Sequence, residues 1–356
     1  MRQFLLPFGL LLLTACSGSH PPIEGCVASN DMTPICGMSS SPEDIAVLPD
    51  QRHLLLAHFG GMTPAGPEDQ RSISLFDTET QATKTLYPGG SNGTANWGDS
   101  NCTEPPNEKL GPHGTHLHQL DDGTWRYLVV NHNAREAIEL FEVTGSGANT
   151  GLTWRGCVFP AEDALVNDVV GLNNGDIIYT KMYTKSDSLA LMKSLIGITT
   201  GELWRWNQSK GLTAYDTTRA AQPNGIEISA DNKYVYANMY MEEQVWKVDV
   251  ASGEVVAKGD VPHGDNSAWG SDGRLWVATH NGGLDILDCF DEPGAPCPAS
   301  YDIYALDTET MQAEIVLSHT GTPMGAATVA VPLNGKVYLG SFAGERMIIM
   351  PDFIKK

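Results

Sequence analysis

A unit of two short apolar strands joined by a polar turn recurs along this chain, and this repeat constrains the fold more than any other feature. Each unit opens on a polar residue, continues as an apolar strand, turns at Asp, Asn or Gly and enters a second apolar strand. Clear copies begin at Glu43, Asn167, Asn224 and Asn266, and weaker ones begin near Gly114 and Gly325. Six similar units, roughly 40 to 70 residues apart, indicate a repeat architecture.

Further strands follow the second strand of a unit, as the segment after Asn224 illustrates. There residues 244–250 form a third β-type run, a turn follows at 251–253, and residues 254–258 form a fourth run. Four-stranded units at this period predict an all-β fold, a six-bladed β-propeller. A β-sandwich would also explain alternating strands, but it would not explain six similar units.

One segment departs from the strand pattern. In residues 186–197, Leu189, Met192 and Leu195 or Ile196 lie at helical spacing, which predicts a short helical insertion in the third blade. Such a helix can pack on the face of the propeller or form a lid over a site, and contact with a membrane is a further possibility.

The N-terminus has the order of a secretory signal. Residues 1–15 carry Arg2, an apolar run from Phe4 to Leu13 that is too short to span a bilayer, and small residues before Cys16. Leu13 to Cys16 resembles the bacterial lipobox, which implies a lipid on Cys16, a tether over 16–25 and a single propeller domain over 26–356. We therefore expect an exported protein, anchored by its lipid to the bacterial outer membrane and facing the periplasm or the cell surface. The alternative is a soluble secreted protein cut near Ala15.

The seven cysteines agree with this anchor. Setting Cys16 aside for lipid leaves an even set, which suits disulfides in an oxidising compartment. Proximity suggests the pairs Cys26–Cys36 and Cys289–Cys297, and elimination leaves Cys102–Cys157.

The net charge of -21 repels phosphate backbones, so nucleic acid is not expected as a partner. Clustered carboxylates and amides can instead act as ligands for hard cations. The residues that open the inner strands converge near the axis of a propeller, and all of them offer oxygen atoms. These openers predict a calcium site and are Glu43, Asn167, Asn224, Asp265 and Asn266.

Asp44 and Asp168 each follow one of these openers. Neighbouring side chains in an extended strand point in opposite directions, so this pair would face away from the first ion. Either they cap local turns or they bind a second ion deeper in the fold.

Histidines concentrate in the second unit. His113 opens its inner strand and His132 ends the next strand, so adjacent strands could bring the two rings together. A positioned pair of this kind can take a proton from water and pass it on. His116 and His118 alternate along the same strand, which would suit two ligands of a zinc site. No third ligand can be identified from the spacing in the sequence.

These motifs together resemble the paraoxonase family of arylesterases and lactonases. The matching segments are 43–45, 112–114, 128–132 with 138–141, 167–170, 224–229 with 233–236, and 265–266 with 275–277. The similarity covers roughly residues 41–345, and related propellers, the gluconolactonases and strictosidine-synthase-like proteins, match the His113 and His132 motifs less well.

The resemblance implies two calcium ions and a histidine dyad. A catalytic calcium would be held by the five openers, and a structural calcium by Asp44, Asp168 and the backbone carbonyl of Thr115. His113 and His132 would form the dyad.

The chain also departs from the family in places. No cysteine follows Cys297 to tie the chain ends together, so blade closure must rest on strand pairing. Gln222 stands where the family carries an apolar aromatic residue, which leaves substrate preference open.

The expected function is a calcium-dependent hydrolase of lactones or aryl esters, with a small-molecule substrate. The ion would polarise the carbonyl, and a histidine would activate the attacking water. Two alternatives remain, a non-catalytic calcium-stabilised propeller that binds a ligand or a protein, and a sugar lactonase like the gluconolactonases.

Mass spectrometry of the N-terminal peptide tests the anchor. We expect Cys16 to be the first residue of the mature chain and to carry the mass of a diacylglycerol group. An unmodified peptide that begins near Cys16 would instead support the soluble secreted form.

Overall fold

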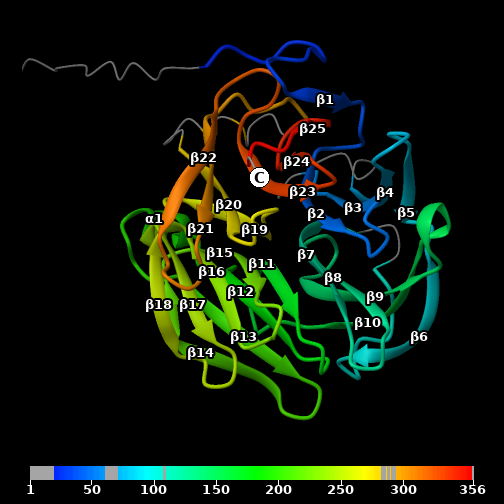
Figure 1. Cartoon of the computed structure of the whole chain (residues 1–356). Coiled ribbons are helices and arrows are strands. Elements are labelled where there is room, and N and C mark those ends of the chain that lie inside the picture. The colour runs from blue at the N-terminus through cyan, green and yellow to red at the C-terminus, as the bar shows by residue number, and fades with distance from the viewer. Residues whose placement is uncertain are drawn as a thin grey trace, which may run out of the picture.

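The computed structural model describes residues 20–60, 71–106, 110–281, 286, 289 and 294–354. Six β-sheets surround a common centre (Figure 1), which confirms the six-bladed propeller. The innermost strands contact one another in a closed ring. The predicted signal sequence and the predicted lipidation site at Cys16 lie outside the described residues. Among the described residues, the structure has no helix of the length and hydropathy needed to cross a membrane.

The blades follow the chain in order, and each begins with its innermost strand. Blade one holds β2 (Pro42–Val47), β3 (His53–His58), β4 (Ser72–Asp77) and β5 (Thr83–Tyr87). Blade two holds β7 (Pro112–Gln119), β8 (Trp125–Asn131), β9 (Ala137–Thr144) and β10 (Gly151–Val158). Blade three holds β11 (Ala164–Gly171), β12 (Ile177–Thr184), β13 (Gly201–Asn207) and β14 (Gly211–Ala220).

The second half of the ring repeats this arrangement. Blade four holds β15 (Pro223–Ile228), β16 (Tyr234–Met239), β17 (Gln244–Asp249) and β18 (Val255–Asp260). Blade five holds β19 (Gly264–Trp269), β20 (Leu275–His280), β21 (Tyr301–Leu306) and β22 (Ala313–His319). Blade six holds β23 (Ala327–Leu333), β24 (Lys336–Ser341), β25 (Arg346–Pro351) and, as its outer strand, β1 (Thr33–Cys36).

The predicted helical insertion is present. Helix α1 (Ala190–Leu195) lies between β12 and β13 of blade three, and it is shorter than the 186–197 segment that the spacing marked. Two 3-10 turns are also described, at Gly147–Asn149 and Tyr240–Glu242.

The ring closes by pairing the two ends of the chain. Strand β1 runs antiparallel to β25, with Thr33 opposite Ile349 and Cys36 opposite Arg346 (Figure 1). Buried Arg346 also donates a 2.9 Å hydrogen bond to the carbonyl of Gly25. Closure therefore rests on strand pairing, as expected, with an added side-chain tie.

Blade two departs from the four-stranded pattern. A fifth strand, β6 (Ser91–Gly98), runs parallel to β10 at its outer edge. The Cys102–Cys157 disulfide fastens the segment after β6 to β10. The other two predicted disulfides, Cys26–Cys36 and Cys289–Cys297, are also formed.

The core is divided among the interfaces between blades. One buried apolar cluster lies between each pair of neighbouring blades in the described part of the chain. Because side chains alternate along a strand, β3 serves two interfaces. Leu54 and Leu56 pack against blade six, and Leu55 packs against blade two.

Every inner strand shifts its pairing register near its start. In β2, β7, β11, β15, β19 and β23 the ladder with the second strand skips one or two residues, as in a β-bulge. A bulge re-aims side chains and leaves backbone groups without ladder partners. The residues at these shifts include all five predicted openers.

Side chains from the second strands satisfy some of the freed backbone groups. The Thr180 hydroxyl accepts the amide N–H of Asp168 at 3.0 Å, and the Asn131 side chain accepts that of Gly111 at 2.8 Å. Asn238 reaches the next blade and donates to the carbonyl of Asp265. These bonds hold the bulges in defined positions around the axis.

Two of the bulges require glycine. A Cβ atom on Gly114 would collide with Asp168 of blade three, and one on Gly225 would collide with the Asp265 backbone of blade five. The glycines allow the bulges of neighbouring blades to meet at the axis.

Candidate active site

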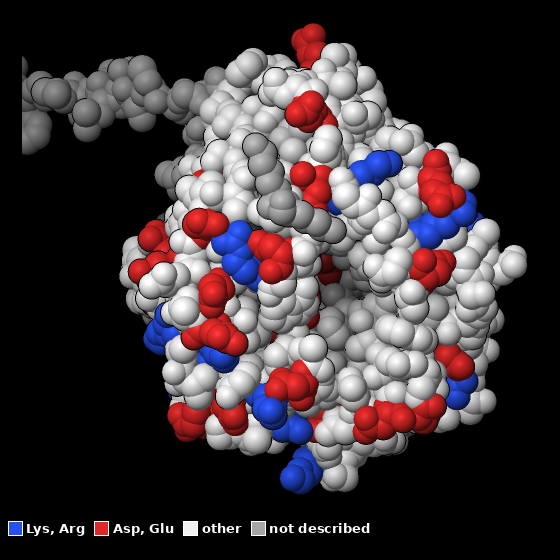
Figure 2. Space-filling model, viewed as in Figure 1, with Lys and Arg blue, Asp and Glu red and all other residues white. Residues whose placement is uncertain are grey.

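A cavity of about 610 Å³ lies at the end of the channel where the inner strands begin. Its floor carries Glu43, Asn167, Asn224 and Asp265 from four different blades, and His113 lies beside them. The face of the molecule in Figure 2 is hollowed near its centre, where acidic atoms are visible within the opening. The structure thus brings the predicted openers together.

The axial oxygens lack partners. Glu43 Oε2 and the Oδ1 atoms of Asn167, Asn224 and Asn266 are buried and have no hydrogen-bond partner within the described residues. The amide nitrogens are used elsewhere, since that of Asn266 donates to Glu43 Oε1 at 2.7 Å. Buried oxygen atoms left without a donor are costly, and a hard cation would satisfy all of them.

The donor set suits calcium because it mixes carboxylates with amides. Calcium accepts six to eight oxygens in irregular geometry. Among the described residues, no group of three or more His, Cys, Asp and Glu side chains lies in metal-binding geometry. The donors of the axial set are all oxygen atoms, so the set does not match the nitrogen and sulfur ligands typical of structural zinc.

The charges of the buried carboxyl groups also favour a bound cation. Burial raises the pKa of Glu43 well above its usual value, and the charges of Asp265 and Asp44 raise it further. Burial also raises the pKa of Asp265 to about 7. Carboxylates crowded in this way are stabilised as anions only by a positive partner.

His113 and His132 form the expected pair. His113 Nδ1 lies 3.0 Å from His132 Nε2, and His113 Nε2 lies 3.6 Å from Glu43 Oε1. Phe59 stacks on the His113 ring at a centroid distance of 4.5 Å. Burial lowers the pKa of His113 well below its usual value, so the ring is neutral and able to accept a proton at physiological pH.

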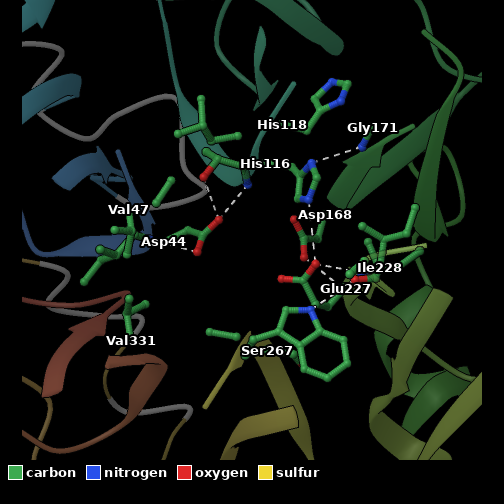
Figure 3. Close-up of a pocket in the computed structure, with 18 of the residues that line it drawn as sticks. Asp44, Val47, His116, His118, Asp168, Gly171, Glu227, Ile228, Ser267 and Val331 are labelled. Carbon is green, nitrogen blue, oxygen red and sulfur yellow. Dashed lines mark hydrogen bonds and ion pairs between the residues drawn. The ribbon is translucent and has the colours of Figure 1, made fainter. Parts of the chain in front are cut away.

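Asp44 and Asp168 face a second cavity of about 440 Å³ on the far side of the axial set. Figure 3 shows the two carboxylates on opposite sides of this cavity. Asp44 accepts the amide and the hydroxyl of Thr115, both at 2.7 Å, and Asp168 accepts the amide of Ile226 at 2.8 Å. Burial raises the pKa of both aspartates. Asp44 Oδ1 and both oxygens of Asp168 accept one hydrogen bond each, so they keep an acceptor position with which these residues can hold a cation as well as order the bulges.

The extra histidines have structural partners. His116 Nδ1 accepts the amide of Gly171 at 3.2 Å, and its Nε2 lies 3.7 Å from Glu227 (Figure 3). His118 Nε2 accepts a 2.8 Å hydrogen bond from buried Arg126. His116 thus links blade two to Gly171 of blade three and to Glu227 of blade four, whereas the bond between His118 and Arg126 lies within blade two. The acceptor nitrogen of each ring is used by a hydrogen-bond donor and not by a metal.

Two further side chains of the first cavity, His280 and Tyr240, were not among the predicted site residues. His280 ends β20, and its Nε2 lies 3.5 Å from Asp265 Oδ2. The Tyr240 hydroxyl lies 3.3 Å from His280 Nδ1. Each of these residues lies at the end of the second strand of its blade, as His132 does. Polar and aromatic residues at that position of each unit could therefore have been predicted as site residues.

Helix α1 forms part of the cavity wall. Leu191 and Leu195 line the cavity, although they are exposed, as are Met192 and Ile196, which do not line it. Gln222, which also lines it, accepts a 3.4 Å hydrogen bond from Ser194 of the helix. The helix is thus both packed on the propeller face and in contact with the site.

Comparisons with known proteins agree with this architecture. A family model described as arylesterase matches residues 26–347. The chain belongs to the arylesterase family. Serum paraoxonase/arylesterase 1 of Homo sapiens is 23% identical over 320 residues, which cover 86% of this chain and 84% of that protein. Serum paraoxonase/lactonase 3 of Homo sapiens is 22% identical over 319 residues, covering 85% of this chain and 84% of that protein.

Solved structures share the fold at lower identity. A gluconolactonase of Xanthomonas campestris has a TM-score of 0.53 and 15% identity, covering 90% of this chain and 89% of its own. A luciferin-regenerating enzyme also has a TM-score of 0.53, with 14% identity and coverage of 88% and 92%. Membership of the arylesterase family supports a hydrolase of the esterase and lactonase type.

The raised carboxyl pKa values predict how the metal-free protein responds to pH. A carboxyl group with a higher pKa in the folded chain than in the unfolded chain contributes stability below its unfolded pKa, and this is lost as pH rises through the folded pKa. With chelator present, we therefore expect the melting temperature to fall as pH rises through about 7, where Asp265 ionises. Excess calcium should flatten the profile in differential scanning fluorimetry.

The variant Asp265→Asn serves as a control for this experiment. It keeps an oxygen atom at the site and removes the ionisation, so its chelated profile should be flatter than that of the wild type. Identical profiles with calcium and with chelator would contradict the assignment.

Proposed function

We propose that this protein is a calcium-dependent hydrolase of lactones, aryl esters or both. The observation that carries the proposal is the set of four buried, unpartnered oxygens beside a histidine pair. A cation held there, within reach of a substrate in the cavity, supplies Lewis-acid polarisation of a carbonyl group and stabilises the oxyanion.

In this proposal the cation is calcium, held by Glu43, Asn167, Asn224, Asp265 and Asn266. The mixed carboxylate and amide oxygens support this choice. A second calcium, held by Asp44, Asp168 and the Thr115 carbonyl, would fix the bulges from the other side. Its role would be structural, because the histidines described along the second cavity, His116 and His118, already use their acceptor nitrogens for Gly171 and Arg126.

His113 is the proposed general base. Its Nε2 takes a proton from a water molecule as that water attacks the carbonyl carbon, and the C–O bond to the leaving oxygen then breaks. The proton passes back to the leaving oxygen, so the base is regenerated. His132 accepts a hydrogen bond from His113 Nδ1 and keeps the ring in place during both transfers.

The cavity wall supports an apolar substrate. Phe59, Met182, Leu191, Leu195, Ile286 and Phe342 line it above the polar floor. Apolar walls with a few convergent polar groups are typical of small-molecule sites. A lactone or ester with a hydrocarbon portion would place its carbonyl on the axis and its chain against α1. The lipid anchor and the cellular location stay predictions, because residues 1–19 lie outside the described part.

An assay with a panel of lactones and aryl esters tests the reaction. We expect hydrolysis in the presence of calcium, its loss after chelation, and recovery when calcium is restored. Release of acid can be followed by pH-stat titration. If chelation lowers the melting temperature but no substrate in the panel is turned over, a calcium-stabilised binding propeller explains the site better.

The variant His113→Gln tests the role of the base. We expect kcat to fall by about a hundredfold or more, because general-base catalysis contributes about that much. His319→Gln, at a half-buried histidine outside the cavity, is the matched control and should retain activity. Unchanged lactonase activity in His113→Gln would remove His113 from this role.

A further inference from the structure

Glu136 contacts His132 on the side of the ring away from His113. No motif or spacing in the sequence predicted this residue as part of the site. It belongs to the turn between β8 and β9, four residues after His132. Its Oε1 and Oε2 atoms lie 3.1 and 3.2 Å from His132 Nδ1. Both side chains are only 8% exposed, so water competes little for this contact.

A carboxylate can only accept a hydrogen bond, and this fixes where the protons lie in the neutral rings. His132 must carry its proton on Nδ1 to donate to Glu136. Its Nε2 then has a lone pair, which accepts the proton that His113 carries on Nδ1 at 3.0 Å. The lone pair of His113 therefore lies on Nε2, the atom beside Glu43 in the cavity.

The opposite arrangement would disable the base. If each ring carried its proton on Nε2, the bond between His113 and His132 would still form, with His132 as donor. His113 would then present an N–H group to the cavity instead of a lone pair. The hydrogen bond between the two rings forms in either arrangement. The group bonded to His132 Nδ1 therefore determines which tautomers are present.

We propose that Glu136 is a positioning residue that fixes the tautomers of His132 and His113 and thereby keeps the acceptor nitrogen of His113 in the cavity. This inference rests on the proposed function, in which His113 is the general base. Glu136 touches neither His113 nor the cavity floor in any contact that the structure records, and it acts through His132 alone.

Contacts from blade three hold the carboxylate in place. Glu136 Oε1 accepts the amide of Val166 at 2.9 Å, and Lys185 Nζ lies 3.8 Å from Oε2. Lys185 is 41% exposed, so solvent screens its attraction and the Val166 bond is the stronger restraint. The carboxylate is therefore fixed from two blades, and Val166 directly precedes the axial Asn167.

Glu136→Gln provides the test because it changes the hydrogen bonding and keeps the shape. The Gln oxygen can still accept the Val166 amide, which leaves its NH₂ group facing His132 Nδ1. The oxygen that stays 3.1 Å from Nδ1 is already bonded to the Val166 amide, so the new donor in place of Oε2 favours the tautomer in which Nδ1 accepts. In a serine-protease triad the equivalent Asp to Asn change lowers kcat by about 10⁴ through the wrong tautomer. We expect a fall in kcat of at least about tenfold, with KM little changed, in the calcium-loaded full chain.

NMR of ¹⁵N-histidine-labelled protein reads the tautomer without any substrate. In the wild type we expect His132 to be protonated on Nδ1, and in Glu136→Gln on Nε2, with a His132→Gln spectrum providing the assignment. Glu136→Asp keeps an acceptor-only group, so it should retain the wild-type tautomer and lose less activity than Glu136→Gln. A protein that turns over no ester or lactone would refute the proposed function, while the spectra would still decide the tautomer.

Glu142→Gln is the matched control. Glu142 lies in β9 of the same blade, pairs with Arg155 at 2.8 Å and has no recorded contact with the histidines. It should keep the wild-type spectrum and kcat. Protonation of wild-type His132 on Nε2 would overturn the proposal. So would a Glu136→Gln variant that keeps the wild-type tautomer, or one that switches tautomer with kcat unchanged.

Discussion

The register shift at the start of every inner strand is the constraint on which the rest of the structure depends. A regular strand would turn alternate side chains away from the axis and would pair every backbone group with its neighbour. The shift frees both the side chains and some of the backbone. Thr180 and Asn238 then bind backbone groups at the shifts, and the openers are left to face the channel.

The same shifts set the charge balance of the molecule. Glu43 and Asp265 face the first cavity, and Asp44 and Asp168 face the second cavity farther along the channel. Four buried carboxylates so close together oppose one another, and burial raises the pKa of each. The apolar interfaces between the blades hold these carboxylates together despite their mutual repulsion. A bound cation would offset that repulsion.

Much of this could be predicted from the sequence, because the repeat and the openers are local patterns. The six units, the three disulfides, the helix in blade three and the meeting of His113 with His132 were all predictable. In a regular strand the adjacent side chains of Asp265 and Asn266 would point to opposite faces. They can share one site only because of the bulge at the start of β19. Glu136 and β6 were missed for a related reason, since a contact with His132 across a turn and a parallel edge strand are set by tertiary packing rather than by spacing.

The closing pair of strands has a consequence for how the molecule is made. Strand β1 is synthesised first, but its partner β25 is among the last segments to appear, so the final blade cannot exist until nearly the whole chain is present. Contacts this distant in sequence form slowly, and until they form the outer edge of β25 lacks its neighbour. The openers, which come from four blades, reach their common position at the axis only in the finished ring. The metal-binding geometry is therefore a property of the complete circle, and no single blade contains it.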